Sequence, residues 1–166
     1  MSGLEQSIEV NVPVSTAYNQ WTQFEEFPRF MEGVEKIQQL DDQRLHWVAK
    51  IAGVEREWDA KITEQTPDQR IAWRNIDGAT NAGVVTFHKI DDTTTKIMLQ
   101  LEFDPEGLAE QAADKLGIIR ARTRGDLERF KAFIESRGTE TGAWRGEIEQ
   151  DSGAGPSTPT GVSSNV

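Results

Sequence analysis

Between residues 34 and 103 the chain is a series of short segments in which apolar and polar residues alternate, separated by turn-forming residues. Alternation with a period of two is typical of a β-strand with one buried face, and tight turns join strands that run antiparallel. A similar segment, Leu4–Val12, precedes them and ends at Pro13. We therefore expect one antiparallel sheet of seven strands. Its other strands are Val34–Leu40, Arg44–Ala52, Val54–Thr66, Arg70–Ile76, Asn81–Ile90 and Thr94–Phe103.

Two short helical segments are expected between the first and second strands. Ser15 is a candidate N-cap for a helix over Thr16–Thr22, because serine oxygens accept the free N–H groups at a helix start. Phe24, Phe27 and Phe30 follow at spacings of three, which predicts a short helical turn that buries their rings. This aromatic turn would close part of the concave face of the sheet.

The last regular element is a long helix. Asp104 is its expected N-cap, Pro105 its first residue, and Gly138 lies just past its end. About 32 residues with a rise of 1.5 Å each give a length of roughly 48 Å. Apolar or small residues recur between these ends at intervals of three and four, which indicates one buried stripe. The stripe consists of Leu108, Ala112, Leu116, Ile119, Thr123, Leu127, Phe130 and Ile134.

A sheet with one apolar face and a helix with one apolar stripe bury both surfaces when they pack against each other. We therefore expect an α+β fold, in which a curved seven-stranded antiparallel sheet wraps around a long C-terminal helix. A single helix is only about 10 Å wide and cannot fill the concave face of such a sheet. The pattern thus predicts an apolar cavity between helix and sheet, where a small molecule could bind.

Composition limits the function classes. The 166 residues carry a net charge of −10, which counts against nucleic acids and anionic membranes as partners. The chain has no cysteine, which excludes disulfides, cysteine-ligated metals and cysteine nucleophiles. With neither a signal peptide nor an apolar run of membrane-spanning length, we expect a cytoplasmic protein without a membrane segment. We expect one domain over residues 1–147 and a disordered Ser-, Gly-, Pro- and Thr-rich tail over 148–166.

Several local patterns, taken in their order along the chain, resemble one superfamily. They are residues 12–18 (VPVSTAY), Trp21 with 24–30 (FEEFPRF), 62–73 (ITEQTPDQRIAW), 83–87 (GVVTF) and 126–131 (DLERFK). This set is similar to the START-like (SRPBCC) superfamily, in the branch of polyketide cyclases/dehydrases and coenzyme-Q-binding proteins. The resemblance spans nearly all of residues 4–147. It implies a helix-grip fold that binds a small hydrophobic or amphipathic ligand, such as a lipid, a quinone or an aromatic polyketide.

Candidate ligand-binding residues are apolar side chains expected on the concave face, the aromatic turn or the helix stripe. They are Phe27, Phe30, Trp47, Trp58, Ala60, Ile62, Trp73, Phe87, Leu99, Leu101 and Leu116. The three tryptophans would form either a stacking wall for a flat ligand or part of the core. Arg56 and Asn81 are candidate polar anchors near the rim.

Groups that could catalyse a reaction are scarce on this surface. Aromatase/cyclases of the superfamily typically carry a serine and an arginine two and four positions after a pocket tryptophan. If that tryptophan corresponds to Trp58, the positions hold Ala60 and Ile62 in this chain. We therefore expect ligand binding without catalysis, cofactor or metal. The alternative is a polyketide cyclase/dehydratase in which Arg56 or another rim residue orients the substrate.

Other polar residues have surface interpretations. His46 and His88 fall on the parity opposite the concave face, so we expect both on the convex, solvated side. Arg120, Arg122 and Arg124 are expected on a solvated helix face with ion pairs; a clamp for an acidic ligand head at the cavity mouth is the alternative.

A last motif, residues 141–146 (TGAWRG), follows the long helix. We expect its Trp144 to pack back on the domain and hold the C-terminus. The alternative is a lid or docking element that, together with the tail, would make the chain a protein-interaction module.

Overall fold

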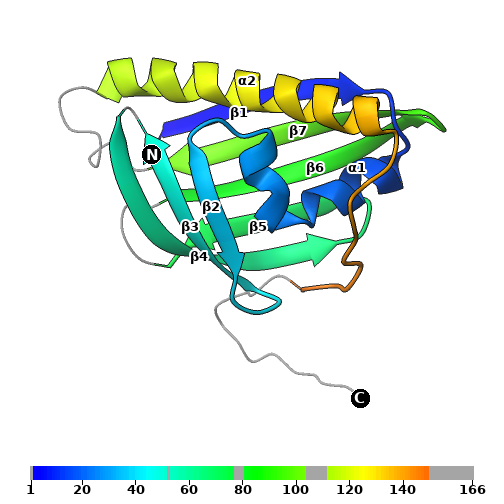
Figure 1. Ribbon diagram of the computed structural model, residues 1–166, viewed down its shortest axis with the longest axis horizontal. Helices are drawn as coiled ribbons and strands as arrows, with labels where there is room; N and C mark the ends of the chain where they lie inside the picture. The colour runs from blue at the N-terminus through cyan, green and yellow to red at the C-terminus, as the bar shows by residue number, and fades with distance from the viewer. Residues whose placement is uncertain (1, 52, 77–80, 104–111, 150–166) are drawn as a thin grey trace.

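The expected sheet is present in the computed structural model, which describes residues 2–51, 53–76, 81–103 and 112–149. Over these residues seven strands form one antiparallel sheet in the order β1-β7-β6-β5-β4-β3-β2 (Figure 1). The strands are β1 (Ser2–Val10), β2 (Val34–Gln39), β3 (Arg44–Ile51), β4 (Val54–Thr66), β5 (Arg70–Asn75), β6 (Asn81–Asp91) and β7 (Thr94–Phe103). The helices are α1 (Val14–Trp21), the 3₁₀-helix η1 (Phe24–Arg29) and α2 (Ala112–Arg137).

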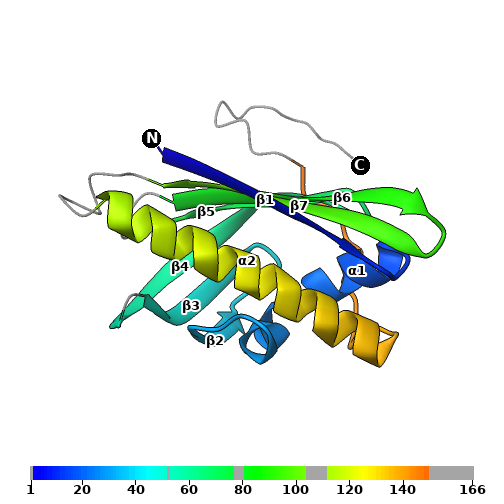
Figure 2. The ribbon, with the colours of Figure 1, turned by 90° about the horizontal axis from the view of Figure 1, so that it is seen from above.

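The sheet is bent, and α2 lies on its concave side (Figure 2). The register of β4 against β5 shifts between Ile62 and Glu64, and that of β6 against β7 shifts between Lys89 and Asp91. Such bulges bend a strand and increase its local twist. Strands β3 and β4 therefore turn away from the plane of β6 and β7 (Figure 2).

Helix α2 lies obliquely across the concave face, as Figures 1 and 2 show. Its buried residues Leu127, Phe130 and Ile134 follow the expected stripe. Gly138, at φ 76°, has the left-handed conformation that ends a helix, and its N–H donates to the carbonyl of Ile134 (2.9 Å). The expected helix start at residues 104–105 lies outside the described residues. None of the described helices combines the length and apolar character needed to cross a membrane.

Helix α1 corrects one detail of the sequence analysis. The residue at its N-cap position is Pro13 (φ −61°, ψ 155°), and no side chain caps the helix start. Ser15 lies inside the first turn, so its assignment as the N-cap was wrong. The proline ring fixes an extended conformation directly before Val14, and the Pro13 carbonyl already accepts the N–H of Ala17 (3.1 Å).

The aromatic turn has the expected form. In a 3₁₀-helix residues three apart lie above one another, and η1 accordingly aligns Phe24, Phe27 and Phe30, all of them buried. Neighbouring rings in this row have their centroids 5.4 Å apart. The row covers the β2–β3 side of the concave face.

Residues 139–149, called here the C-terminal strap, run back over α1 (orange in Figure 1). The N–H of Trp144 donates to Thr22 Oγ1 (3.0 Å), and its side chain packs against the hydrophobic core. The expectation that Trp144 packs back on the domain is confirmed. Ile148 is buried and pairs with Gln65, so packing extends one residue beyond the expected domain end at 147. The rest of the expected tail, 150–166, lies outside the described residues.

Candidate functional site

A cavity of about 200 Å³ lies between the concave face of the sheet and α2. Its walls come from α1, η1, the loop before β2, strands β2, β3, β4, β5 and β7, and α2. Most of the lining side chains are apolar. The polar ones among the described residues are Glu32, Asn75, Arg122, Thr123 and Asp126.

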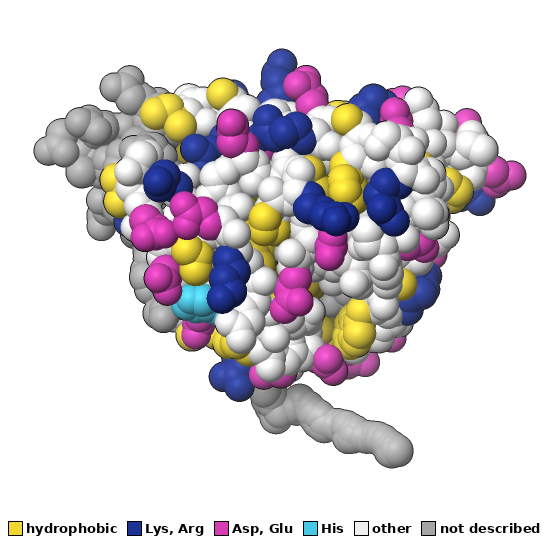
Figure 3. Space-filling view, viewed as in Figure 1, with side chains coloured by type: hydrophobic (Ala, Val, Ile, Leu, Met, Phe, Trp, Pro, Cys, Tyr) yellow, Lys and Arg dark blue, Asp and Glu magenta, His cyan; other side chains and the backbone are white. Residues whose placement is uncertain are grey.

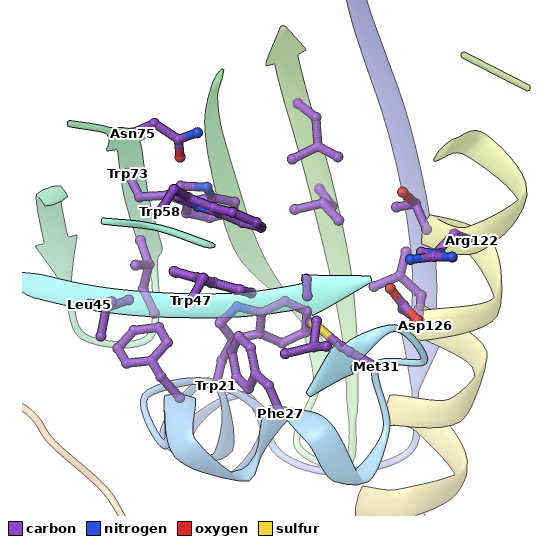
Figure 4. Close-up of a pocket in the computed structure, with 18 of the residues that line it drawn as sticks. Trp21, Phe27, Met31, Leu45, Trp47, Trp58, Trp73, Asn75, Arg122 and Asp126 are labelled. Atoms are coloured by element: carbon purple, nitrogen blue, oxygen red, sulfur yellow. The ribbon is translucent and has the colours of Figure 1, made fainter. Parts of the chain in front are cut away.

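Three indole side chains form one wall of this cavity (Figure 4). Trp47 on β3 and Trp58 on β4 are direct partners in the antiparallel ladder, and their rings stack with centroids 5.8 Å apart and planes 8° from parallel. Trp73 on β5 completes the wall. This arrangement makes the wall largely aromatic, and an outer face of the stack can take a further flat ring.

Gly83 on β6 makes room for Trp73. The two residues are partners in the β5–β6 ladder, and Leu101 is the partner of Gly83 in β7. A Cβ atom at position 83 would lie 2.8 Å from Trp73 Cε2 and 2.9 Å from Leu101 Cδ2. Glycine within a strand often marks such a close approach. The absence of a side chain here lets the Trp73 indole lie flat against the sheet.

The opposite wall is polar and belongs to α2. Arg122 and Asp126, one turn apart, extend from the helix toward the cavity (Figure 4). Arg122 Nη1 donates to the backbone carbonyl of Lys50 at the end of β3 (2.6 Å). Asp126 Oδ1 accepts from Arg129 Nη2 (2.6 Å) and from the N–H of Glu32 (3.1 Å). These contacts tie α2 to the loop before β2 and to β3.

The environment of Asp126 changes its acidity. Burial raises the pKa of Asp126 from its ordinary 3.8 to about 6, although the hydrogen bond and charge of Arg129 and the N–H of Glu32 act in the opposite direction. Loss of hydration beside the apolar cavity disfavours the charged carboxylate. Near neutral pH this side chain can therefore exchange a proton more readily than a surface aspartate.

Most of the predicted ligand-binding residues do line the cavity. They are Phe27, Trp47, Trp58, Ile62, Trp73, Leu99 and Leu101. Their role in binding a ligand stays a prediction. The side chains of Leu116 and Asn81 lie outside what the structure describes.

Four other predicted residues lie away from the cavity lining. Phe30 is buried against Phe130 of α2 (ring centroids 5.1 Å apart), and Phe87 is buried under α1 against Tyr18. Ala60 is buried between its ladder partners Leu45 and Asn75, where its short side chain does not reach the cavity. Arg56 is exposed near the β3–β4 turn, and its role as a polar anchor stays a prediction.

Sequence reasoning gave a position at the cavity only as the alternative for Arg122 and did not consider Asp126. Arg122 was expected on a solvated helix face, but it lines the cavity. Its neighbours Arg120 and Arg124 are exposed as expected, and Figure 3 shows basic side chains spread over α2 with carboxylates between them. The sequence did contain one indication of this wall. Residues 122 and 126 lie directly beside the buried stripe residues 123 and 127, on one side of the stripe.

The two histidines lie on the convex side, as expected. His46 Nδ1 lies 2.7 Å from Asp59 Oδ1, and its Nε2 lies 3.1 Å from Glu57 Oε1. The hydrogen bond to Asp59, followed by that to Glu57, raises the pKa of His46 above its usual range. His88 Nε2 lies 3.0 Å from Thr86 Oγ1. Among the described residues, no three histidine, aspartate or glutamate side chains cluster in a way that could hold a metal ion.

Comparison with known proteins identifies the family. A family model described as "Polyketide cyclase / dehydrase and lipid transport" matches residues 10–133. The chain belongs to this family. A curated relative, described as an uncharacterized 17.2 kDa protein in the melC2-rnhH intergenic region of Streptomyces lincolnensis, is 60% identical over 149 residues. The match covers 89% of this chain and 99% of that relative.

Solved structures share the fold of this chain. The Zhui aromatase/cyclase from Streptomyces sp. R1128 has a TM-score of 0.73 at 16% identity, over 86% of this chain and 99% of that one. A START superfamily protein from Mycobacterium smegmatis has a TM-score of 0.68 at 11% identity, over 81% and 98% of the respective chains. The expected α+β helix-grip fold, a curved antiparallel sheet around a C-terminal helix, is thereby confirmed.

Proposed function

We propose that this family member binds one small, flat, mainly apolar molecule in the cavity and releases it unchanged. The observation that carries the proposal is the indole wall, in which the stacked pair Trp47 and Trp58 stands beside Trp73. Stacked aromatic faces attract another flat ring system by dispersion and by burial of apolar surface. The apolar lining and the family's description, which includes lipid transport, support a binding role.

The size of the cavity favours one small guest. At about 200 Å³ it lies below the range of roughly 300–1,000 Å³ that is common for ligand pockets. Burial of about 350 Å² of apolar ligand surface would contribute about 9 kcal/mol. Association costs about 4 kcal/mol or more, so the net free energy of about 5 kcal/mol corresponds to a dissociation constant below 1 mM. Such an affinity suits a carrier with a broad range of ligands.

The absence of the family's usual reactive groups on β4 supports release without reaction. Aromatase/cyclases that the chain resembles place a serine and an arginine on the strand after the pocket tryptophan, whereas this chain has Ala60 and Ile62 there. Ala60 is buried behind the lining and Ile62 contributes only apolar surface.

Fluorescence titration with 1-aminoanthracene, an uncharged three-ring probe, tests the proposal. We expect saturable binding of one molecule per chain, with the stoichiometry read by native mass spectrometry. Gly83→Ala should weaken binding about tenfold, because the added methyl group pushes the Trp73 indole into the cavity. Gly117→Ala, at an exposed helix position with nothing within 4 Å, is the matched control and should bind as the wild type does. No saturable binding of this probe, of a quinone or of a fatty acid would refute the proposal.

A polyketide cyclase/dehydratase is the second candidate, favoured by Arg122 and Asp126 at the cavity wall. A guanidinium can polarise a ketone, and a carboxyl with a pKa of about 6 can accept or donate a proton. Incubation with a minimal polyketide synthase distinguishes the two functions. A product profile that changes with the wild type but not with Asp126→Asn favours the enzyme; an unchanged profile favours the carrier.

A further inference from the structure

The ionisable groups of the cavity lining are unevenly distributed, and this distribution indicates which chemical groups a ligand would carry at each end. The indole wall belongs to β3, β4 and β5, whereas Arg122 and Asp126, the ionisable lining residues of α2, lie on the other side (Figure 4). A ligand that fills the cavity therefore has one flat apolar face against the tryptophans and one end near Arg122. The question is which chemical group suits that end.

Arg122 is the cation at this end, and its charge is unmatched by direct contact. Its observed partner is an uncharged backbone carbonyl, that of Lys50. Within the described part of the chain no carboxylate lies within ion-pair distance of its guanidinium. A guanidinium has five N–H donors in a planar fork, so most of its donor capacity is open to another acceptor.

The nearby carboxylate does not take that role. Asp126 is already paired with Arg129 and accepts the N–H of Glu32. Asp126 is attracted by the charge of Arg122 as well, but its direct ion pair is with Arg129, so the guanidinium of Arg122 has no carboxylate in contact within the described part of the chain. Glu32, whose side chain is 77% exposed, is solvated and lies 3.9 Å from Arg129.

The position of the Arg122 guanidinium is fixed by the fold. It passes directly over Gly33, where a Cβ atom would lie 2.9 Å from Arg122 Cζ and 2.9 Å from the Lys50 carbonyl oxygen. Gly33 has φ 93°, and its carbonyl accepts the N–H of Lys50 (2.6 Å). The backbone of the loop before β2 thus forms a seat for the guanidinium, which reduces the entropy that binding would cost.

We propose that Arg122 determines ligand specificity by binding an acidic head group, a carboxylate or an equivalent anion, of an otherwise flat apolar molecule. This inference rests on the proposed function and names the class of ligand. The planar fork of a guanidinium matches a carboxylate with two parallel hydrogen bonds, and charge-assisted bonds are about twice as strong as neutral ones. The apolar rings of the same molecule lie against Trp47, Trp58 and Trp73.

The test compares two probes of the same shape, anthracene-2-carboxylate and anthracene-2-carboxamide, by calorimetric titration at pH 8. The wild type should bind the carboxylate about tenfold more tightly than the amide. Arg122→Gln should abolish this preference while its affinity for the amide changes little. Arg122→Lys, which keeps a charge without the fork, should retain part of the preference. Arg124→Gln, an exposed arginine on the same helix, is the matched control and should keep the full preference.

Each outcome has a separate meaning. Equal affinity of the wild type for both probes overturns this inference and leaves the proposed function intact. If Arg122→Gln lowers the affinity for both probes equally, this inference is also overturned, because Arg122 would then only shape the cavity. If Arg124→Gln lowers the preference as much as Arg122→Gln does, a general surface charge effect replaces the proposed site. If the wild type binds neither probe but does bind 1-aminoanthracene, this inference is wrong and the proposed function stands; if none of the ligands named for the proposed function binds either, both are wrong. Thermal unfolding of each variant verifies that it is folded.

Discussion

The indole rings of Trp47 and Trp58 stack with their centroids 5.8 Å apart and their planes 8° from parallel. The two residues face each other directly in the β3–β4 ladder, so the backbone register sets the stack. Both rings line the cavity, and an outer face of such a stack can take a further flat ring. The specificity proposed above depends on this surface and on the guanidinium opposite to it.

Replacement of one stacked ring tests whether flatness matters. Trp58→Leu keeps an apolar side chain but removes the ring, and we expect the affinity for 1-aminoanthracene to fall about three- to tenfold, since aromatic pairs contribute about 0.5–1.5 kcal/mol beyond their buried area. Trp58→Phe keeps a ring and should retain most of the affinity. Fluorescence titration of both variants provides the measurement. Equal affinities of the leucine and phenylalanine variants would show that stacking contributes nothing.

Two glycines, one inside the long helix and one just past its end, should respond in opposite directions to replacement by alanine. Gly117 is exposed within α2 and a Cβ there meets nothing within 4 Å, so Gly117→Ala should stabilise the protein by about 0.5–1 kcal/mol. Gly138 has φ 76°, which alanine tolerates poorly, so Gly138→Ala should destabilise it by about 1 kcal/mol. Urea unfolding measures both. A loss of stability in Gly117→Ala would contradict the helical environment described here.

The raised pKa of Asp126 predicts a specific dependence of stability on pH. With a pKa of about 6 when folded and 3.8 ordinarily, this carboxyl binds more protons in the folded state than in the unfolded state between these values. Stability from this group is therefore greatest below about pH 4, falls as pH rises toward 6 and is constant above. The expected loss is on the order of 2 kcal/mol.

Asp126→Asn, an uncharged analogue of the protonated acid, isolates this effect. The free energy of unfolding of the variant minus that of the wild type should increase by about 2 kcal/mol between pH 4 and pH 7, because other titrating groups cancel in the difference. Urea unfolding at several pH values gives this difference. If it decreases with pH instead, the ion pair with Arg129 outweighs burial and the pKa of Asp126 is lowered.

From the sequence we could predict on which face of the sheet each residue lies. We could predict less well where on that face it lies. Strand parity places Trp47, Trp58 and Trp73 together on the concave face because successive side chains alternate strictly. Parity cannot tell that Phe87, on the same face, is covered by α1. That distinction depends on where α1 and η1 pack, which no local pattern encodes.

The polar wall was harder to predict for a related reason. The stripe through Thr123 and Leu127 shows which side of α2 faces the sheet, and both residues are buried. Residues on either flank of that stripe are equivalent in the sequence. Only the oblique crossing of the helix over the sheet decides that the flank with Arg122 and Asp126 overlooks the cavity, and this crossing follows from three-dimensional packing.

The C-terminal strap gives the last prediction, on what anchors it to α1. Gln20 is fully buried, its Nε2 donates to Thr141 Oγ1 (3.0 Å), and its Oε1 accepts the N–H of Thr141 (2.8 Å). Gln20→Ala removes both hydrogen bonds and leaves polar groups of the strap without partners, so we expect a loss of about 1–3 kcal/mol in the free energy of unfolding. Gln38→Ala, at an exposed position of β2, is the control and should change stability by less than about 0.5 kcal/mol.

Urea unfolding measures the loss of stability in Gln20→Ala, and hydrogen exchange at Trp144 and Ile148 shows whether the loss is at the strap. Faster exchange at both residues in Gln20→Ala is expected because the strap then detaches more often; unchanged exchange together with wild-type stability would mean that the apolar contacts of Trp144 and Ile148 hold the strap without Gln20.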